Sequence, residues 1–248
     1  MKNYKKNVEK ITPYNDNESK SAQIETAFDR IAQRYDFMNR LLSMGIDTSW
    51  RRKALRSLGD ITPVQILDVA AGTGDLSIMA AKKFRRAEVT GIDLSQKMLD
   101  IAKNKAKRKV PSQQIHFVQG DCLKMPFADD TFDLATIAFG IRNFENINTG
   151  CQEIRRVLKP GGILLIIELS RPQNKILSCF YNLYLNHVIP VLGRVLTGST
   201  SEYRYLPESI KYVPQGAEML ALLGDAGFSN RSLVTHTFGI CTCYTVEK

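Results

Sequence analysis

The sequence predicts an α/β protein built on a doubly wound, mostly parallel β-sheet. From residue 64 onward, short β-branched runs alternate with helix-like segments. Two of these runs, VQILDV at 64–69 and GILLIIEL at 162–169, are apolar on both faces, as strands covered by helices on either side must be. The chain then finishes in two strand-like runs with a short link, which adds an antiparallel hairpin to the parallel sheet.

The elements can be placed in order along this alternation. Strands are expected at residues 64–69, 87–93, 115–119, 132–139 and 163–169. Helices are expected at residues 75–84, 95–109, 146–158 and 214–226. Ser95 is placed as an N-cap and Gly227 as a C-terminal stop, where these residue types favour helix ends. We therefore expect helices on both faces of the sheet.

The final hairpin is expected from residues 231–236 and 240–246, joined at Phe238 and Gly239. This link is too short for a right-handed crossover, so the two strands should pair antiparallel. Cys241 and Cys243 lie two positions apart and so face the same side of the last strand. Packing as small buried residues explains this pair better than a metal site does.

The composition limits the class of protein. The chain has 248 residues, 44% of them hydrophobic, with 34 basic and 25 acidic residues and a net charge of +9. These values exclude a disordered tail or a collagen-like chain and favour one domain with appendages. Five scattered cysteines do not form a disulfide scaffold, so a reducing, cytoplasmic location is expected. The basic balance favours an acidic partner such as nucleic acid, anionic lipid or a phosphorylated substrate.

Three segments are distinguished along the chain. Residues 1–20 are polar and expected to be loosely ordered, residues 21–60 form a helical cover, and residues 61–248 form the sheet domain. A helical lid is inserted at about 174–205. Polar residues interrupt its apolar run, which favours an amphipathic helix over a membrane span. That helix either packs on the protein's own core or lines a site.

The most informative segment is the run ILDVAAGTGDL at residues 66–76, a buried strand that passes through small residues into a helix. Gly72 and Gly74 are expected to let the backbone approach a ligand closely. Ser77 stands where a dinucleotide fingerprint requires its third glycine, and no triphosphate-binding loop is present. The turn therefore favours neither a dinucleotide nor a triphosphate.

Acidic residues at successive strand ends indicate a cationic ligand. Asp68 and Asp75 flank the glycine turn, Asp93 ends the second strand and Asp121 ends the third. Carboxylates repel a pyrophosphate but attract S-adenosylmethionine (SAM), which carries a sulfonium and an ammonium and no phosphate. Asp93 suits the ribose hydroxyls and Asp121 the adenine amino group. The sequence thus predicts a Rossmann-like, class I SAM-dependent methyltransferase without a metal, although each aspartate alone could be a helix N-cap.

Four further segments resemble the quinone-ring C-methyltransferases of menaquinone and ubiquinone biosynthesis. They are YDFMNRLLS at 35–43, FGIRN at 139–143, RVLKPGG at 156–162 and YRYLPESI at 203–210. The Y-D-x-M-N and F-G-I-R-N patterns are specific, whereas K-P-G-G occurs in many methyltransferases. The resemblance runs from about residue 27 to the end of the chain and implies SAM contacts at Thr73, Asp93, Asp121 and Cys122. With the glycine turn, the predicted cofactor site comprises Asp68, Gly72, Thr73, Gly74, Asp93, Asp121 and Cys122.

The resemblance also implies the substrate class. The first expectation is C-methylation of a polyprenylated hydroquinone, 2-demethylmenaquinol to menaquinol, the last step of menaquinone biosynthesis. The corresponding benzoquinol of the ubiquinone pathway is the alternative. Two remoter hypotheses are a nucleic-acid methyltransferase, which the basic charge prompts, and a quinone carrier that keeps SAM only for structure. The basic cluster has no interleaved aromatic residues, so we expect no nucleic-acid partner.

Ring methylation by a sulfonium requires an ionised neighbouring hydroxyl, and a phenol with a pKa near ~10 needs help to ionise at neutral pH. Arg142 and Asn143 are expected to stabilise the phenolate oxygen. Asp36 or Tyr35 is expected to take the proton, with His187 as a weaker alternative. The structural alternatives are that Arg142 pairs with a carboxylate and that Asp36 caps a helix.

Two surfaces are candidates for lipid contact. The family's substrates carry prenyl tails, so the lid's apolar face is expected to line a tail groove through Phe180, Tyr181, Tyr184 and Leu185. Residues 82–109 hold ten basic and three acidic residues, and the lysines of the second helix are expected on its outer surface, away from the crevice. That cluster suits peripheral attachment to the inner face of an anionic membrane, or is simply solvated. The sequence is also compatible with a homodimer.

Overall fold

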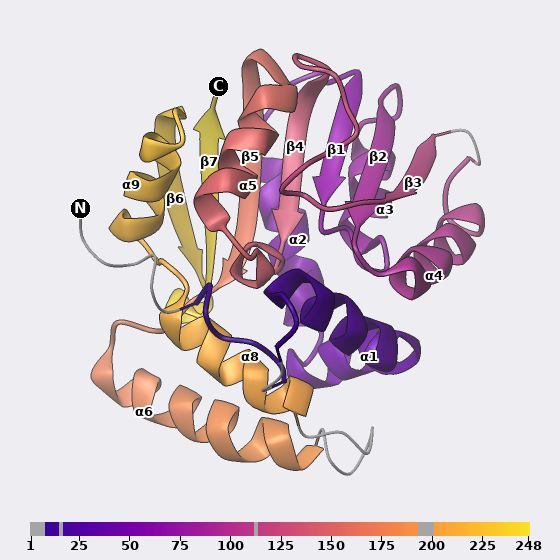
Figure 1. The fold of residues 1–248 in the computed structure, drawn as a ribbon. Helices are drawn as coiled ribbons and strands as arrows, with labels where there is room; N and C mark the ends of the chain where they lie inside the picture. Colours follow the sequence, from indigo (N-terminus) through magenta and orange to yellow (C-terminus); the bar gives the residue numbers. More distant parts are fainter. Residues whose placement is uncertain (1–7, 15–16, 112–113, 193–200) are drawn as a thin grey trace.

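The computed structural model describes residues 8–14, 17–111, 114–192 and 201–248, with backbone only at 201–203. Over these residues the sheet has seven strands, in the order β3-β2-β1-β4-β5-β7-β6 (Figure 1). The parallel strands are Gln65–Val69 (β1), Glu88–Asp93 (β2), Ile115–Gln119 (β3), Phe132–Ala138 (β4) and Leu158–Leu169 (β5). Strands Ser229–His236 (β6) and Cys241–Glu247 (β7) pair antiparallel, and β7 also pairs antiparallel with β5. The predicted fold class and hairpin are confirmed.

Two groups of helices cover the two faces of this sheet. On one face lie Ile46–Ser57 (α2), Asp75–Lys83 (α3) and Gln96–Lys107 (α4), and on the other Ile147–Val157 (α5) and Ala217–Asp225 (α9). The Ser95 side chain accepts a hydrogen bond from the backbone N–H of Met98, and Gly227 follows α9 with φ of 95°, so both predicted helix ends are confirmed. Strand β5 begins earlier than predicted, because its K-P-G-G segment forms a bulge opposite β4 rather than a separate turn.

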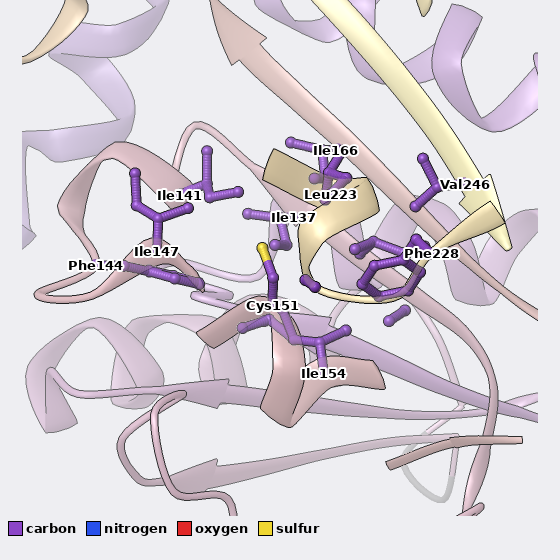
Figure 2. Packing of buried hydrophobic residues seen from close by; sticks show 14 of the residues in the cluster. Ile137, Ile141, Phe144, Ile147, Cys151, Ile154, Ile166, Leu223, Phe228 and Val246 are labelled. Carbon is purple, nitrogen blue, oxygen red and sulfur yellow. The ribbon is translucent and has the colours of Figure 1, made fainter. Parts of the chain in front are cut away.

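Each face of the sheet buries its own apolar core. Figure 2 shows part of the larger core, where β4, β5, α5 and α9 meet through Ile137, Ile154, Ile166, Leu223 and Phe228. Cys241 and Cys243 both lie buried in the core on the opposite face, as the strand period predicted. The central strands β1, β4 and β5 are largely apolar on both faces because both faces are covered.

A further layer of helices caps the carboxyl ends of the parallel strands (Figure 1). This cover layer consists of Lys20–Leu42 (α1), Lys175–Leu183 (α6), the π-helical turn Tyr184–Val188 (η3) and Ser201–Tyr212 (α8). Its members pack on one another through Met38, Leu185, Ile189 and Ile210. The inserted helices continue beyond the predicted end near residue 205, because α8 accommodates Pro207 within its length.

The segment before α1 is packed where the structure describes it. Val8 is fully buried in the larger core, and the Lys20 ammonium donates to the carbonyls of Val8 (2.7 Å) and Arg142 (3.0 Å). Residues 8–14 therefore contact the rest of the chain, and the loose order expected of residues 1–20 stays a prediction, since residues 1–7 and 15–16 lie outside the described residues. Over the described ranges, none of the helices combines the length and the apolar character that a membrane crossing requires.

Candidate active site

A cavity opens at the carboxyl ends of β1, β2 and β3. We call it the strand-end cavity; its floor includes Gly72, Asp93, Asp121 and Cys122. Its cover comes from α1, which contributes Ser21, Ile24, Glu25, Phe28 and Tyr35. The sequence predicted the floor but only a helical cover above it, because helix periodicity does not tell which side chains face a ligand. The crossing of α1 over the strand ends selects these five.

Asp93 fixes the geometry of the floor. Its carboxylate accepts hydrogen bonds from the backbone N–H of Gly72 (2.8 Å) and of Ser95 (2.9 Å). Burial raises the pKa of Asp93, while these N–H donors oppose that rise. Each carboxylate oxygen has two lone pairs, so acceptor sites remain for ligand hydroxyl groups in the cavity. One side chain thus ties the turn after β1 to the end of β2 and still faces the ligand space.

Asp121 and Cys122 lie together at the end of β3, as predicted. The Asp121 carboxylate accepts from the backbone N–H of Leu123 at 2.9 Å, which stabilises the turn. Burial, with Asp121 nearby, raises the pKa of the Cys122 thiol well above its usual value. Cys122 is therefore a neutral contact in the cavity wall and is not a reactive thiolate.

The two glycines of the turn serve different purposes. Gly72 has φ of 55° and lines the cavity, and a side chain built there would meet nothing within 4 Å. Gly74 has φ of 76°, but a Cβ there would lie 2.9 Å from Ala102 Cβ and 3.0 Å from the Phe117 ring. Gly72 leaves room for a ligand. At Gly74, α4 and β3 occupy the space that a side chain would need, and the predicted approach of a ligand to the backbone there stays a prediction.

Asp68 lies beneath the turn. It is 1% exposed and accepts hydrogen bonds from the hydroxyls of Ser77 and Thr136. Burial raises its pKa to about 6. With Thr73, Asp68 borders a small polar cavity next to the strand-end cavity, and neither residue lines the larger one. The structure therefore places these two predicted cofactor residues behind the turn.

A chain of ion pairs joins α1 to the glycine turn. Asp75 pairs with Lys105 (2.7 Å) and with Arg40 (2.8 Å), so its charge is already matched. Lys105 also pairs with Asp36 at 2.6 Å, and Asp36 accepts from the Thr73 hydroxyl at 2.5 Å. Arg40 reaches on to Asp47. These two cations reduce the attraction predicted at Asp75 for a cationic ligand, which stays a prediction.

Lys105 and Asp36, both in this chain of ion pairs, lie differently from what the sequence predicted. Lys105 is 16% exposed at its side chain and points into the molecule, so the expectation that all lysines of α4 lie on its outer face is wrong. The reason is that α1 crosses α4 and offers Asp36 as a partner. Asp36, the predicted base, faces Lys105 and is absent from the residues that line the cavities described here.

A second cavity lies on the other side of Tyr35 and Phe139, which line both cavities. We call it the tyrosine cavity; its walls include Trp50 and Arg142 from the sheet side and a set from η3 and its neighbours, Tyr181, Tyr184, Leu185 and Ile189. Three of the four predicted lid residues line it. Phe180 does not, because it lies on the outer side of α6 with 67% of its surface exposed.

Arg142 is one of two buried arginines that line the tyrosine cavity, the other being Arg51. Arg142 lies in a short 3-10 turn, Ile141–Asn143, and its guanidinium pairs with Glu168 at 2.7 Å while donating to the Phe139 carbonyl. Burial acts to lower the pKa of Arg142, but Glu168 raises it above the ordinary value, so the side chain stays charged. Its Nε has no hydrogen-bond partner within the described part of the chain. The sequence had not singled out Glu168.

Asn143 and Tyr35 lie between the cavities. The Asn143 side-chain oxygen accepts from the Tyr205 hydroxyl at 3.0 Å, and Asn143 borders both the strand-end cavity and a third, largely apolar cavity between α1 and α8. Burial raises the pKa of Tyr35, so its hydroxyl stays protonated at neutral pH. His187, the weaker alternative base, is exposed on η3. Among the described residues, no His, Cys, Asp and Glu side chains gather as a metal site would require.

The sheet order, the glycine turn and the acidic strand ends define a class I SAM-dependent methyltransferase. Solved structures share this fold. A SAM-dependent methyltransferase from Thermotoga maritima, described as a possible histamine N-methyltransferase, matches with TM-score 0.63 and 16% identity over 90% of this chain and 99% of that one. Phosphoethanolamine N-methyltransferase 2 of Haemonchus contortus, solved with S-adenosyl-L-methionine, matches with TM-score 0.61 and 16% identity over 80% of this chain and 52% of that one.

Within that class, the chain belongs to the ubiE/COQ5 methyltransferase family, whose model matches residues 16–248. A demethylmenaquinone methyltransferase of Bacteroides fragilis is 45% identical over 97% of this chain and 98% of its own. A ubiquinone/menaquinone biosynthesis C-methyltransferase UbiE of Geotalea daltonii is 42% identical over 92% and 97%. The resemblance drawn from the sequence is confirmed, and the protein is a methyltransferase that uses SAM.

Proposed function

We propose that this enzyme transfers the methyl group of SAM to a ring carbon of 2-demethylmenaquinol and so forms menaquinol. The observation that carries the proposal is the pair of cavities on either side of Tyr35 and Phe139. One has acidic strand ends, and the other is largely apolar with a buried arginine. The relatives named for demethylmenaquinone favour the naphthoquinol, and those named for ubiquinone and menaquinone keep the benzoquinol as the alternative.

In this proposal the strand-end cavity binds SAM. Asp93 accepts from the ribose hydroxyls, Asp121 accepts from the adenine amino group, and Cys122 contributes its backbone and a neutral thiol contact. The open space at Gly72 admits the methionine part. Asp68, Thr73 and Gly74 support the turn from behind rather than touch the cofactor, which modifies the roles first expected of them.

The tyrosine cavity is proposed to bind the quinol ring. The hydroxyl proton first passes to the acceptor. A new bond then forms between a ring carbon and the transferred methyl carbon while the sulfur–methyl bond breaks and leaves its electrons on sulfur. The proton of that ring carbon finally moves to the oxygen through water, which restores the aromatic hydroquinol. Arg142 stays charged in a buried setting, where it favours the ionised hydroxyl next to the attacking carbon. Asn143 lies between the strand-end cavity and the third cavity and is proposed to orient that hydroxyl by its amide group.

The proton acceptor remains a prediction. Asp36 was proposed for this role, but its carboxylate pairs with Lys105 and would have to leave that partner to reach the substrate. Tyr35 lies closer to the chemistry, since it borders both cavities, but its raised pKa makes the neutral form a hydrogen-bond donor rather than a base. Asp36 therefore stays the predicted acceptor, reached through water because its carboxylate does not line the tyrosine cavity.

The division of the chain and its partners belong to the same proposal. Residues 61–248 form the SAM-binding domain, and residues 21–60 with the inserted lid close it. The third cavity, between α1 and α8, offers apolar walls to the first isoprene units of the tail. We propose a cytoplasmic enzyme attached peripherally to the inner membrane face, with no nucleic-acid partner; a homodimer is testable by sedimentation.

The experiment is methyl transfer from labelled SAM with two chemically reduced substrates in competition, a demethylmenaquinol and the corresponding demethylated benzoquinol. Product mass then identifies the ring that is methylated. We expect methylated naphthoquinol and no product from either oxidised quinone. Absence of product with both quinols, under conditions where calorimetry shows that SAM binds, would overturn the proposal and leave a SAM-binding carrier.

A further inference from the structure

Helix α6 and the turn after it expose an apolar face. None of the residues of α6 is buried, although most of them are apolar. The large apolar side chains with 38–70% of their surface exposed in this region are Ile176, Leu177, Phe180, Leu183, Val188 and Val191. They make up half of the exposed large apolar side chains in the described part of the chain. Such a concentration on one short segment marks an interaction surface.

The exposed side chains form one stripe. Ile176, Phe180, Leu183 and Val191 recur at spacings of three, four and eight, which places them on one side of a helix. The opposite side of the same segment carries Tyr181, Tyr184, Leu185 and Ile189, which line the tyrosine cavity. Figure 1 shows α6 outermost in the cover layer, with α8 between it and the sheet. One segment therefore separates the tyrosine cavity from the outside.

The charge along the sequence of this segment has one sign. No aspartate or glutamate lies between Glu168 and Glu202 in the sequence. Arg171 and Lys175, just before and at the start of α6, are exposed. An apolar stripe with exposed cations at its end is the pattern of helices that lie in the surface of an anionic bilayer. A surface for an acidic protein would not need six exposed large apolar side chains.

We propose that α6 docks on an anionic lipid bilayer. The outward stripe enters the boundary between headgroups and acyl chains, and Arg171 and Lys175 contact the headgroups. The prenylated quinol then passes from the bilayer around the inner side of α6 into the tyrosine cavity; this last clause rests on the proposed function. The docking surface is thus the lid itself, rather than the basic residues of 82–109, of which Lys83 and Lys105 are already engaged inside the protein.

The test is sedimentation of the full chain with vesicles, without substrate or SAM. Vesicles of phosphatidylcholine alone are compared with vesicles containing phosphatidylglycerol. The variant is Phe180→Glu with Leu183→Glu, and the matched control is Val64→Glu with Val234→Glu, which adds the same charge at two exposed apolar sites on other elements. We expect the α6 variant to lose at least tenfold in affinity for anionic vesicles and the control less than threefold.

A second measurement reports the docking directly. Cys179 is an exposed cysteine of α6, whereas Cys151, Cys241 and Cys243 are buried and Cys122 is partly so. A polarity-sensitive dye on Cys179 should shift to shorter wavelength when anionic vesicles are added and should not shift in the α6 variant. Equal vesicle binding by the α6 variant and the control would overturn the proposal. So would a dimer in sedimentation that the α6 variant no longer forms, because a second copy of the chain would then cover the stripe.

Catalysis separates this proposal from the proposed function. With a short-tailed quinol in detergent, the α6 variant should keep its turnover, because the exposed stripe does not line the tyrosine cavity. With a long-tailed quinol in vesicles, its turnover should fall with its vesicle binding. Vesicle binding without any methyl transfer by the unmodified protein contradicts the proposed function alone, whereas turnover without vesicle binding contradicts the docking alone.

Discussion

The floor of the strand-end cavity and the cover layer above it are held by different interactions. In the floor, backbone groups bond across strand ends: Ala71 N–H donates to the Ile92 carbonyl, and Gly120 N–H donates to the Asp93 carbonyl, each at 3.0 Å. The cover is fastened mainly by side chains, such as the pairs of Lys105 with Asp36 and of Arg40 with Asp75. A sheet register is shared by many bonds, whereas an ion pair depends on two side chains.

The contrast indicates which half of the site can move. The floor cannot shift without disturbing β1, β2 and β3 together, so the fold sets the geometry of the proposed cofactor site. The cover layer packs on itself through its own small apolar cluster, so we expect it to rearrange by exchanging a few charged partners while the sheet stays intact. A reaction that admits a bulky substrate and then excludes water is served by this division.

Arg142 joins the two regions and should give the largest effect. Arg142→Met leaves Glu168, 2% exposed, as a buried carboxylate without its cation. We expect a loss of about 3–5 kcal/mol in the free energy of unfolding and loss of methyl transfer. Urea denaturation and a labelled-methyl assay measure the two. In the double variant with Glu168→Gln, stability should largely return without activity; recovery of activity as well would reduce Arg142 to a structural residue.

Asp68 makes the floor sensitive to pH. Burial raises its pKa in the folded state to about 6 from an ordinary 3.8, so the folded protein holds this proton more tightly than the unfolded chain does. Its contribution to stability is therefore complete below pH ~4 and is lost as pH rises through ~6, a change of about 3 kcal/mol. Denaturation of the unmodified protein and of Asp68→Asn between pH 3.5 and pH 8 should show the difference. Parallel curves would contradict the assignment.

Asp93 tests whether the floor fixes the cofactor. Asp93→Ala removes the acceptor of two backbone N–H groups and the proposed partner of the ribose. We expect about a hundredfold weaker SAM binding, or about 2.7 kcal/mol, by titration calorimetry. Asp100→Ala, on the exposed side of α4, is the matched control and should change affinity less than twofold. Equal losses of SAM affinity in the two variants would contradict the assignment of the strand-end cavity to the cofactor.

Alanine substitutions at the two glycines should affect protein stability and SAM binding to different extents. Gly74→Ala forces a Cβ against Ala102 and Phe117 at positive φ, and about 2 kcal/mol of stability should be lost with little change in SAM affinity. Gly72→Ala meets open space, so it should cost only about 1 kcal/mol in stability but weaken SAM binding more. Thermal unfolding and calorimetry on the same samples decide, and the reverse pattern would contradict the two assignments.

A substitution in the ion pairs of the cover should give the smallest effect on methyl transfer. Lys105→Met removes one of the links between α1 and the glycine turn, and we expect kcat/KM to fall about tenfold, or about 1.4 kcal/mol. Asp36→Asn then identifies the role of Asp36. The same tenfold loss assigns Asp36 to positioning α1, whereas a loss above a hundredfold with an altered pH profile supports its predicted role as the base.

The sheet and floor were predictable because they repeat a local signal. Each strand ends in a recognisable turn, and parallel strands bring their carboxyl ends to one edge, so Asp93 and Asp121 could be placed together without a structure. The predicted bounds failed mainly at β5 and α8, where a bulge and an internal proline do not end an element. Local rules treat both as stops.

The cover was less predictable because its contacts join distant segments. Nothing local links Lys105 to Asp36, Lys20 to Arg142, or Arg142 to Glu168, since each pair depends on how α1 and the 3-10 turn cross the sheet. Asp75 was expected to attract the ligand because its two cationic partners lie 35 and 30 positions away and could not be recognised from the sequence. The apolar lid was found by periodicity, but its inner and outer sides were not distinguished.

The position of β7 has a consequence for the edge of the sheet. β7 follows β6 in the sequence but lies between β5 and β6, so among the described strands β6 pairs with β7 and forms the edge. An edge strand leaves one row of backbone N–H and C=O groups free to pair with another chain. The sequence of β6, SNRSLVTH, is mostly polar and exposed, which disfavours such pairing. Apolar substitutions along β6 should therefore lower the yield of soluble protein more than its final stability.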